Sequence, residues 1–95
     1  MKLEARITSI VGGEKLKAYA SVLVEDSFLA KGIKIIDGRN GRFVAMPSRR
    51  TMNGEYADIC FPITKELREE IERVVLEAYA KKLEEMRYEK TQKHG

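Results

Sequence analysis

The sequence predicts an α+β domain: an antiparallel β-meander of about five strands followed by one long C-terminal α-helix. In the first part of the chain apolar and polar residues alternate, which is the pattern of half-buried strands, and glycine-rich turns separate the runs. After Pro62 the apolar residues recur every three or four residues, which is the pattern of an amphipathic helix. A chain of 95 residues with 43% hydrophobic residues suits one domain, which we place at residues 1–90, with a polar flexible tail at residues 91–95.

Three strands are expected to open the domain, at residues 3–11, 15–24 and 28–36. The pair Gly12-Gly13 supplies the positive φ angles of a tight turn, and residues 25–27 form a second turn. Antiparallel strands of this kind leave one face of the sheet in water. The residues expected on the other face are Leu3, Ala5, Ile7 and Ser9, then Leu16, Ala18, Ala20, Val22 and Val24, then Leu29, Ile33 and Ile35.

Two shorter strands are expected at residues 42–46 and 56–61. Each is followed by a proline, which cannot donate a hydrogen bond to a sheet. Between them we expect a loop at Ser48-Arg49-Arg50-Thr51 and a turn at Asn53-Gly54. Loops that carry a specific pattern are more often concerned with binding or catalysis than with packing.

The helix is expected at residues 64–90, with Thr64 as its N-cap. Acidic residues are concentrated in its first turns and basic residues are concentrated in its last turns. This distribution of charge complements the helix dipole. A helix of this length is about 40 Å long, so its last turns are expected to leave the core and meet a partner subunit or solvent. The expected ion pairs are Glu69–Arg73 and Glu77–Lys81, and the apolar residues expected to contact a partner are Tyr79, Leu83, Met86 and Tyr88.

Basic residues are concentrated between residues 31 and 50. This segment holds six lysines and arginines and one acidic residue, Asp37, a net charge of +5, whereas the whole chain has a net charge of +3. Such side chains in glycine- or proline-bounded loops reach outward to phosphates, and an Arg-Arg pair suits phosphate or guanine contact. The alternative is that they solvate one face of the sheet. The six are Lys31, Lys34, Arg39, Arg42, Arg49 and Arg50, and Phe43 and Tyr56 are nearby rings on which bases could stack.

No pattern in the sequence indicates catalysis, a metal or a cofactor. The one histidine, His94, lies next to the C-terminus, so neither Ser48 nor Thr51 has a base within expected reach. The acidic residues lack metal-ligand spacing. The one cysteine, Cys60, is expected to be a small buried residue in a reducing compartment. We therefore expect a protein that is not an enzyme and that binds no metal and no cofactor.

The chain also carries no targeting signal that the sequence reveals. No apolar stretch approaches the roughly 20 residues that span a bilayer, and the N-terminus has no apolar signal-peptide core. We therefore expect a cytoplasmic protein with no membrane insertion.

The most patterned part of the chain is the segment 36–63, which combines glycine turns, an Arg-Arg pair and two short apolar runs. Its residues Ile36-Asp37-Gly38, Gly41, Phe43-Val44-Ala45-Met46-Pro47-Ser48, Arg50-Thr51, Gly54-Glu55, Asp58-Ile59 and Pro62-Ile63 form one pattern. This pattern resembles the signature of the SpoVG (stage V sporulation protein G) family, and the order of meander, signature and helix resembles it over nearly the whole chain. One departure is Phe61, where the family often has a histidine before the proline, so any role of that histidine is absent here.

The resemblance implies a small, bacterial, cytosolic and dimeric protein without enzymatic activity, built from a twisted antiparallel sheet and a C-terminal helix. Members of the family are linked to septum formation and sporulation control, and they behave as regulators that bind DNA and in some cases RNA. The family's basic loop corresponds to Ser48-Arg49-Arg50-Thr51, and its basic helix end corresponds to the region around Lys81, Lys82, Arg87 and Lys90.

Two hypotheses follow. In the leading one the chain is a homodimeric regulator that binds DNA or RNA, with Arg49 and Arg50 on phosphates and other cations extending the electrostatic footprint. In the alternative it is a protein-interaction module of the cell-division or septum machinery, with a division or sporulation protein as its partner. The nucleic-acid-binding residues of the leading hypothesis are Arg49, Arg50, Lys34, Arg39, Arg42, Lys31, Lys81 and Lys82.

Overall fold

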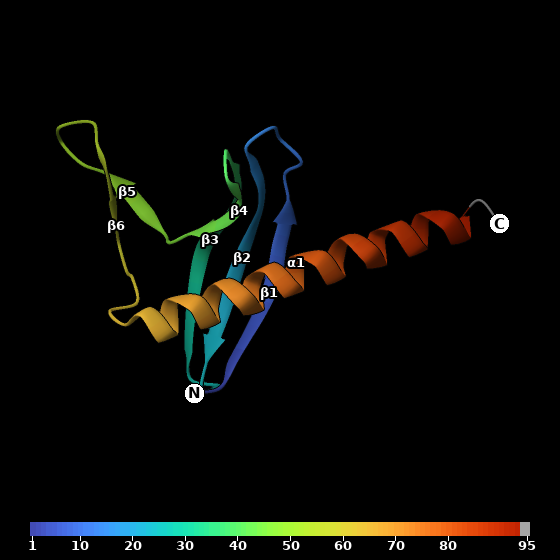
Figure 1. Cartoon of the computed structure of the whole chain (residues 1–95), viewed down its shortest axis with the longest axis horizontal. Coiled ribbons are helices and arrows are strands. Elements are labelled where there is room, and N and C mark those ends of the chain that lie inside the picture. The colour runs from blue at the N-terminus through green and yellow to red at the C-terminus, as the bar shows by residue number, and fades with distance from the viewer. Residues whose placement is uncertain (94–95) are drawn as a thin grey trace.

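The alternating segments form an antiparallel sheet in the computed structural model, which describes the backbone of residues 1–93 and the side chains of residues 1–87. The sheet has the strand order β1-β2-β3-β4, with one helix across it and a separate two-stranded ribbon, β5–β6 (Figure 1). The predicted α+β class is confirmed. The elements are β1 (Leu3–Ile10), β2 (Leu16–Val24), β3 (Phe28–Gly38), β4 (Gly41–Ala45), β5 (Ser48–Arg50), β6 (Tyr56–Asp58) and α1 (Lys65–Lys93).

The core lies between the sheet and α1. Small residues at the centre of β2, Ala18 and Ala20, are completely buried under the helix, and Val75 of α1 is completely buried as well. Full burial of a valine or isoleucine contributes about 1.5–3 kcal/mol, so this layer holds the helix in place. The core consists of Ala18, Ala20, Val22, Ile33, Ile35, Val44 and Met46 from the sheet and Ile71, Val75 and Tyr79 from the helix.

A bulge at Gly32 changes which residues of β3 face the core. The pairing of β2 with β3 shifts between Ala20 and Val22, and Gly32 has a φ of +77°, a conformation that glycine adopts without steric cost. One extra residue in a strand reverses the side-chain alternation beyond it. Ala30 therefore packs against the core while Leu29 is 52% exposed, so the prediction that Leu29 faces inward was wrong.

A second irregularity has the same effect in β1. The register with β2 shifts between Ile7 and Ser9. As a result Ile10 packs against the core, whereas Ser9, which alternation placed on the inner face, is exposed.

The ribbon differs from the loop that the sequence predicts. The segment Ser48–Arg50 is a strand, and it pairs antiparallel with Tyr56–Asp58, which is shorter than the fifth strand expected at residues 56–61. The backbone N–H of Ile59 donates to the carbonyl of Pro47 at 2.7 Å, which closes the base of the ribbon where it joins the sheet. The turn predicted at Asn53-Gly54 is confirmed, with Gly54 at a φ of +83°.

The helix begins where the sequence predicts and extends past its predicted end. The hydroxyl of Thr64 accepts a hydrogen bond from the N–H of Leu67 at 3.2 Å, which confirms Thr64 as the N-cap. The helix ends at Lys93, so the first three residues of the expected flexible tail are helical, and residues 94 and 95 lie outside the described residues. The C-terminal turns project beyond the sheet (Figure 1), and the molecule measures 51 × 32 × 23 Å.

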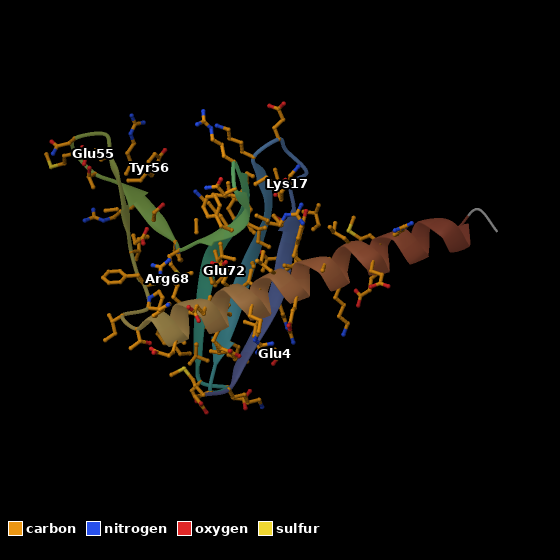
Figure 2. The ribbon with its side chains drawn as sticks, in the orientation of Figure 1. Glu4, Lys17, Glu55, Tyr56, Arg68 and Glu72 are labelled. Atoms are coloured by element: carbon orange, nitrogen blue, oxygen red, sulfur yellow. The ribbon has the colours of Figure 1, made fainter. Side chains whose placement is uncertain are left out.

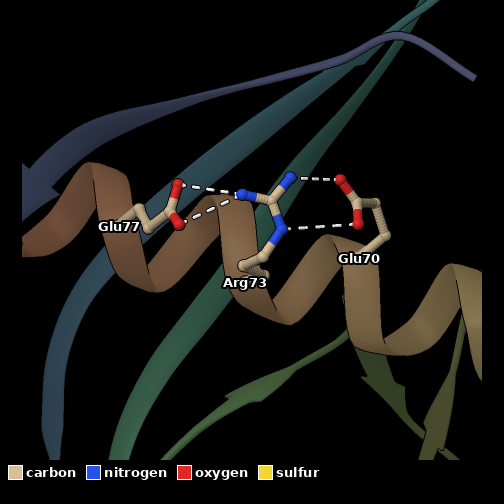
Figure 3. Close-up of polar contacts among 3 residues, drawn as sticks. All are labelled: Glu70, Arg73 and Glu77. Atoms are coloured by element: carbon tan, nitrogen blue, oxygen red, sulfur yellow. Dashed lines mark hydrogen bonds and ion pairs between the residues drawn. The ribbon is translucent and has the colours of Figure 1, made fainter.

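Ion pairs along the exposed side of α1 differ in partner from those expected. Arg73 binds Glu70 on one side and Glu77 on the other, with Nη1 at 3.1 Å from both carboxylate oxygens of Glu77 (Figure 3). Glu69 instead pairs with Lys65 at 3.7 Å. Both neighbours of Arg73 lie three or four residues away, where helical side chains meet. The hydrogen bond that Arg73 donates to the Glu70 carboxylate is the main cause of the raised pKa of Arg73.

Candidate functional site

The ribbon presents the two central arginines to solvent. Arg49 pairs with Ala57 and Arg50 with Tyr56, and all four residues are exposed. Successive side chains of a strand point to opposite faces, so Arg49 and Arg50 extend from opposite faces of the ribbon. The two side chains therefore do not converge on one phosphate, and each can contact a different phosphate.

The tip of the ribbon adds a flat aromatic side chain. Tyr56 is 72% exposed beside Arg50, and the guanidinium of Arg50 lies close to Gly54, where an added Cβ would stand 3.6 Å from Nη2. Figure 2 shows Glu55 and Tyr56 on the projecting ribbon, away from the sheet residue Lys17. In the described part of the chain neither Arg49 nor Arg50 makes an ion pair, although Glu55 and Asp58 lie on the same ribbon.

Arg42, in contrast, is engaged within the protein. Its Nε donates to Oδ1 of Asp37 at 2.8 Å, and its guanidinium lies 4.9 Å from the ring centroid of Tyr79. Lys17 approaches the other oxygen of Asp37 at 3.7 Å. The hydrogen bond from Arg42 lowers the pKa of Asp37, and the same bond raises the pKa of Arg42. Arg42 therefore ties β4 to the helix, and the structure places it away from the ribbon.

The remaining predicted cations divide among three further places. Lys31 and Lys34 lie on β3, and Arg39 is exposed in the turn between β3 and β4. Lys81 and Lys82 lie on α1, beside a hollow of about 290 Å³. The eight predicted residues thus do not form one patch, and the ribbon brings together two of them.

Sequence reasoning missed one cation, Arg6. It lines the same hollow as Lys81 and Lys82, next to the edge strand β1. The only sequence signal for Arg6 is its place on the polar face of the first strand. Its proximity to residues 75 positions later comes from the packing of α1 against β1, which the sequence pattern does not reveal.

The residues that were predicted to contact a partner lie in different environments. Tyr79 is 5% exposed and belongs to the core, so it is not on a partner surface. Leu83 and Met86 are 37% and 42% exposed on the projecting part of α1, and Tyr88 lies outside the residues whose side chains are described.

The base of the ribbon exposes apolar side chains whose exposure the sequence did not predict. Ile59, Phe61 and Ile63 are 63%, 60% and 90% exposed. Phe61 and Cys60 also line an apolar hollow of about 240 Å³ between the sheet and the start of α1. Cys60 is exposed, so the prediction of a buried cysteine was wrong: β6 ends at Asp58, and the residues that follow it are not covered by the sheet.

The described residues contain no group of three or more His, Cys, Asp or Glu side chains that could hold a metal ion. Over the same residues, no helix is long and apolar enough to cross a bilayer.

The fold and the site together define a class of protein: a small α+β domain in which one helix covers a four-stranded meander and a cationic two-stranded ribbon projects from the sheet. The SpoVG family model matches residues 1–81. The chain belongs to the SpoVG family, as the resemblance of its sequence predicted. The match ends at Lys81, so most of the projecting part of α1 lies beyond it.

Three relatives carry the name "Putative septation protein SpoVG". The one from Desulforudis audaxviator (strain MP104C) is 51% identical over 76 residues, which cover 80% of this chain and 86% of that protein. The one from Clostridium botulinum (strain Alaska E43 / Type E3) is 46% identical over 82 residues, or 86% and 90% of the two chains. The one from Clostridium perfringens (strain 13 / Type A) is 46% identical over 78 residues, or 82% and 87%.

Proposed function

We propose that this chain is a cytoplasmic regulatory protein, linked to septation and sporulation control, that acts as a homodimer and binds DNA or RNA through the β5–β6 ribbon without enzymatic activity. The name shared by its relatives supports the link to septation. One observation carries the proposed binding mode: Arg49 and Arg50 are exposed on a projecting ribbon, without an ion pair in the described residues. Cations held in this way are available to phosphates.

The shape of the ribbon suits a nucleic-acid groove. The major groove of B-form DNA admits a two-stranded β-ribbon. Because Arg49 and Arg50 extend from opposite faces, a ribbon in the groove would direct one arginine toward each wall. Tyr56 beside Arg50 adds a ring on which an unpaired base can stack, which is the usual mode of RNA recognition.

A homodimer is supported by the exposed apolar residues. A 95-residue domain has little surplus stability, and this one leaves Ile59, Phe61 and Ile63 largely exposed at the base of the ribbon. The strands β1 and β4 are free sheet edges, which proteins tend to pair or cover. Two-fold symmetry would place two ribbons on one assembly.

The test is fluorescence anisotropy of labelled duplex DNA and single-stranded RNA across a salt series, with the natural protein and with an Arg49→Ala/Arg50→Ala variant. Six phosphate contacts per dimer give a log–log salt slope of about −5 on duplex DNA. We expect the variant to lose duplex binding and most of this slope. A matched control, Lys15→Ala/Lys65→Ala, removes two exposed cations from outside β5 and β6, one in the β1–β2 loop and one at the start of α1, and should retain binding. Light scattering checks that each variant remains a dimer.

Unchanged duplex binding in the arginine variant, or a slope near zero in the natural protein, would contradict this mechanism.

The projecting part of α1 supports a second candidate, a protein-interaction module of the division machinery. Leu83 and Met86 are exposed there, and an amphipathic helix can place such residues in a groove of a partner. Crosslinking in bacterial cells through a photoreactive residue at position 83 tests it. Reproducible crosslinks to one septum protein would favour it, and crosslinks to a second copy of this chain would not.

A further inference from the structure

The four-stranded sheet has a second face that α1 does not cover. In the described part of the chain α1 is the one helix, it packs on the inner face, and the ribbon projects to the side (Figure 1). The register places on the outer face the side chains that alternate with the core residues. These are Glu4, Arg6, Thr8 and Ser9 of β1, Leu16, Tyr19, Ser21 and Leu23 of β2, Leu29, Lys31, Lys34 and Ile36 of β3, and Phe43 and Ala45 of β4.

One end of this face is hollowed. A concavity of about 400 Å³ lies over Ser21, the one small side chain among long neighbours, and Leu23 and Leu29 form part of its wall. Arg6, Lys31 and Glu4 stand at its border, and Arg6 pairs with Glu4 at 4.0 Å. The bulge at Gly32 produces this arrangement, because it turns Leu29 outward and leaves Ala30 in the core. An apolar hollow with Lys31 at its border suits a flat, uncharged ring attached to an anion.

The other end of the face carries aromatic rings. Tyr19 of β2 is directly opposite Lys34 of β3, and Phe43 of β4 is opposite Ile36. The ring of Phe43 lies against Gly38, where an added Cβ would stand only 2.9 Å from the ring carbon Cε1. Any larger residue at position 38 would displace the ring. Phe43 is nonetheless 42% exposed, so its ring rests on the backbone and faces solvent.

The charges on the outer face favour an anion. Arg6, Lys31 and Lys34 are positive, and Glu4 is the one acidic residue among the side chains assigned to this face. Arg6 is 80% exposed at its side chain and also borders the hollow beside Lys81 and Lys82. Arg6 therefore links the two hollows around the edge strand β1; Glu85 also lines the first hollow and Glu4 the second, so basic residues outnumber acidic ones in each by one or two.

We propose that the outer face of the sheet binds single-stranded nucleic acid, with bases on Tyr19 and Phe43 and in the hollow over Ser21, and with phosphates on Lys31, Lys34 and Arg6. Stacking on aromatic rings combined with a positive surface is how proteins bind single strands. Tyr19 and Phe43 are two strand spacings apart across the sheet and two residues apart along it, about 12 Å in all, which accommodates splayed bases but not the paired and stacked bases of a duplex. This inference extends the proposed function to a second surface and does not depend on the ribbon.

The test is anisotropy of a labelled 12-nucleotide uridine RNA and a 12-nucleotide thymidine DNA, with a duplex of the same length for comparison. In a Tyr19→Leu/Phe43→Leu variant we expect single-strand affinity to fall at least about tenfold while duplex affinity is unchanged. In a Lys31→Gln/Lys34→Gln variant the loss of two phosphate contacts should flatten the log–log salt slope for single strands by about 1.4. Phe61→Leu, which removes an exposed ring on a different surface, is the matched control.

The ribbon variant Arg49→Ala/Arg50→Ala separates this inference from the proposed function. If the outer face binds single strands, this variant retains the binding of the uridine RNA even where it loses the duplex. Photocrosslinking with a 4-thiouridine RNA provides a readout in the natural protein that does not depend on a variant's folding. Crosslinks at Tyr19 or Phe43 support the proposal.

Three results would overturn it: crosslinks confined to the ribbon, equal losses of single-strand and duplex binding in the Tyr19→Leu/Phe43→Leu variant, or displacement of the RNA by polyglutamate at equal charge concentration. The last would show that the face recognises charge alone, as an acidic peptide site does.

Discussion

Arg42 shows how one residue's role depends on its partners and not on its neighbours in sequence. By sequence it belongs to a run of cations, yet in the structure it binds Asp37 and lies over the ring of Tyr79. Arg49, seven positions later, makes no ion pair in the described residues. The strand register decides this difference, because Arg42 is on the helix side of β4 and Arg49 is on a ribbon with no helix beside it.

The Asp37 carboxylate should therefore make stability depend on pH. Its pKa is lowered from 3.8 by the hydrogen bond from Arg42, so the folded state favours the charged form. This stabilisation is fully present above the unfolded pKa and is lost as the pH falls through the lower folded pKa. We expect an Asp37→Asn variant to unfold at a lower temperature than the natural protein at pH 7, and the difference to shrink progressively as the pH falls below about 3.8.

Thermal unfolding followed by circular dichroism at several pH values measures this difference. Glu14→Gln, at an exposed carboxylate of the β1–β2 loop, is the control. If the difference in unfolding temperature between the natural protein and the Asp37→Asn variant persists unchanged at pH 2.5, it results from packing and not from charge.

At the scale of single elements, the start of α1 depends on one side chain. Thr64 accepts the N–H of Leu67 and so satisfies one of the unpaired donors of the first turn. We expect Thr64→Ala to lower the free energy of unfolding by about 1 kcal/mol, as measured by urea denaturation. Thr64→Ser keeps the hydroxyl and should restore most of this loss, whereas equal losses in both variants would assign the effect to the methyl group.

The bulge in β3 depends on the backbone freedom of Gly32. An added Cβ would have room, since its nearest neighbour is Cβ of Pro47 at 3.8 Å, but the φ of +77° is costly for any other residue. We expect Gly32→Ala to reduce the free energy of unfolding by about 1–2 kcal/mol, again by urea denaturation. A variant as stable as the natural protein would show that β3 can pair without the bulge, with Leu29 then free to turn inward.

The sequence predicted the elements where one physical rule acts alone. Alternation identified the first three strands of the sheet, glycine turns and a proline bounded the fourth, and the N-cap and spacing identified the helix, because these signals are local. It failed at Leu29 and Ser9, where a bulge reverses the alternation, and at Ser48–Arg50, where polar residues form a strand because a partner strand lies across the turn. The burial of Cys60 was predicted wrongly, and the proximity of Arg6 to Lys81 and Lys82 was missed. Both depend on where segments that are distant in the sequence pack.

At the scale of the whole molecule, the helix is longer than the sheet that supports it. Its C-terminal part carries Leu83 and Met86, which are partly exposed, and a second copy could cover them. If a homodimer forms there, its unfolding temperature should rise with protein concentration, because association stabilises the folded state by mass action. We expect Leu83→Gln/Met86→Gln to remove most of this dependence, as measured by scanning calorimetry at two concentrations a hundredfold apart.

An Ile63→Ser variant is the matched comparison, since Ile63 is 90% exposed at the base of the ribbon. If Ile63→Ser removes the concentration dependence and the helix variant does not, the interface lies at the ribbon.

The position of Tyr79 gives the protein a built-in optical probe. The chain has no tryptophan, so its near-ultraviolet signal comes mainly from tyrosine. Among the tyrosines whose side chains the structure describes, Tyr56 is exposed and Tyr19 is half-buried, whereas Tyr79 of the helix is buried against the sheet, with the guanidinium of Arg42 over its ring. An asymmetric, immobile environment gives such a ring strong circular dichroism, so the loss of that band reports the moment at which the helix separates from the sheet, without any label.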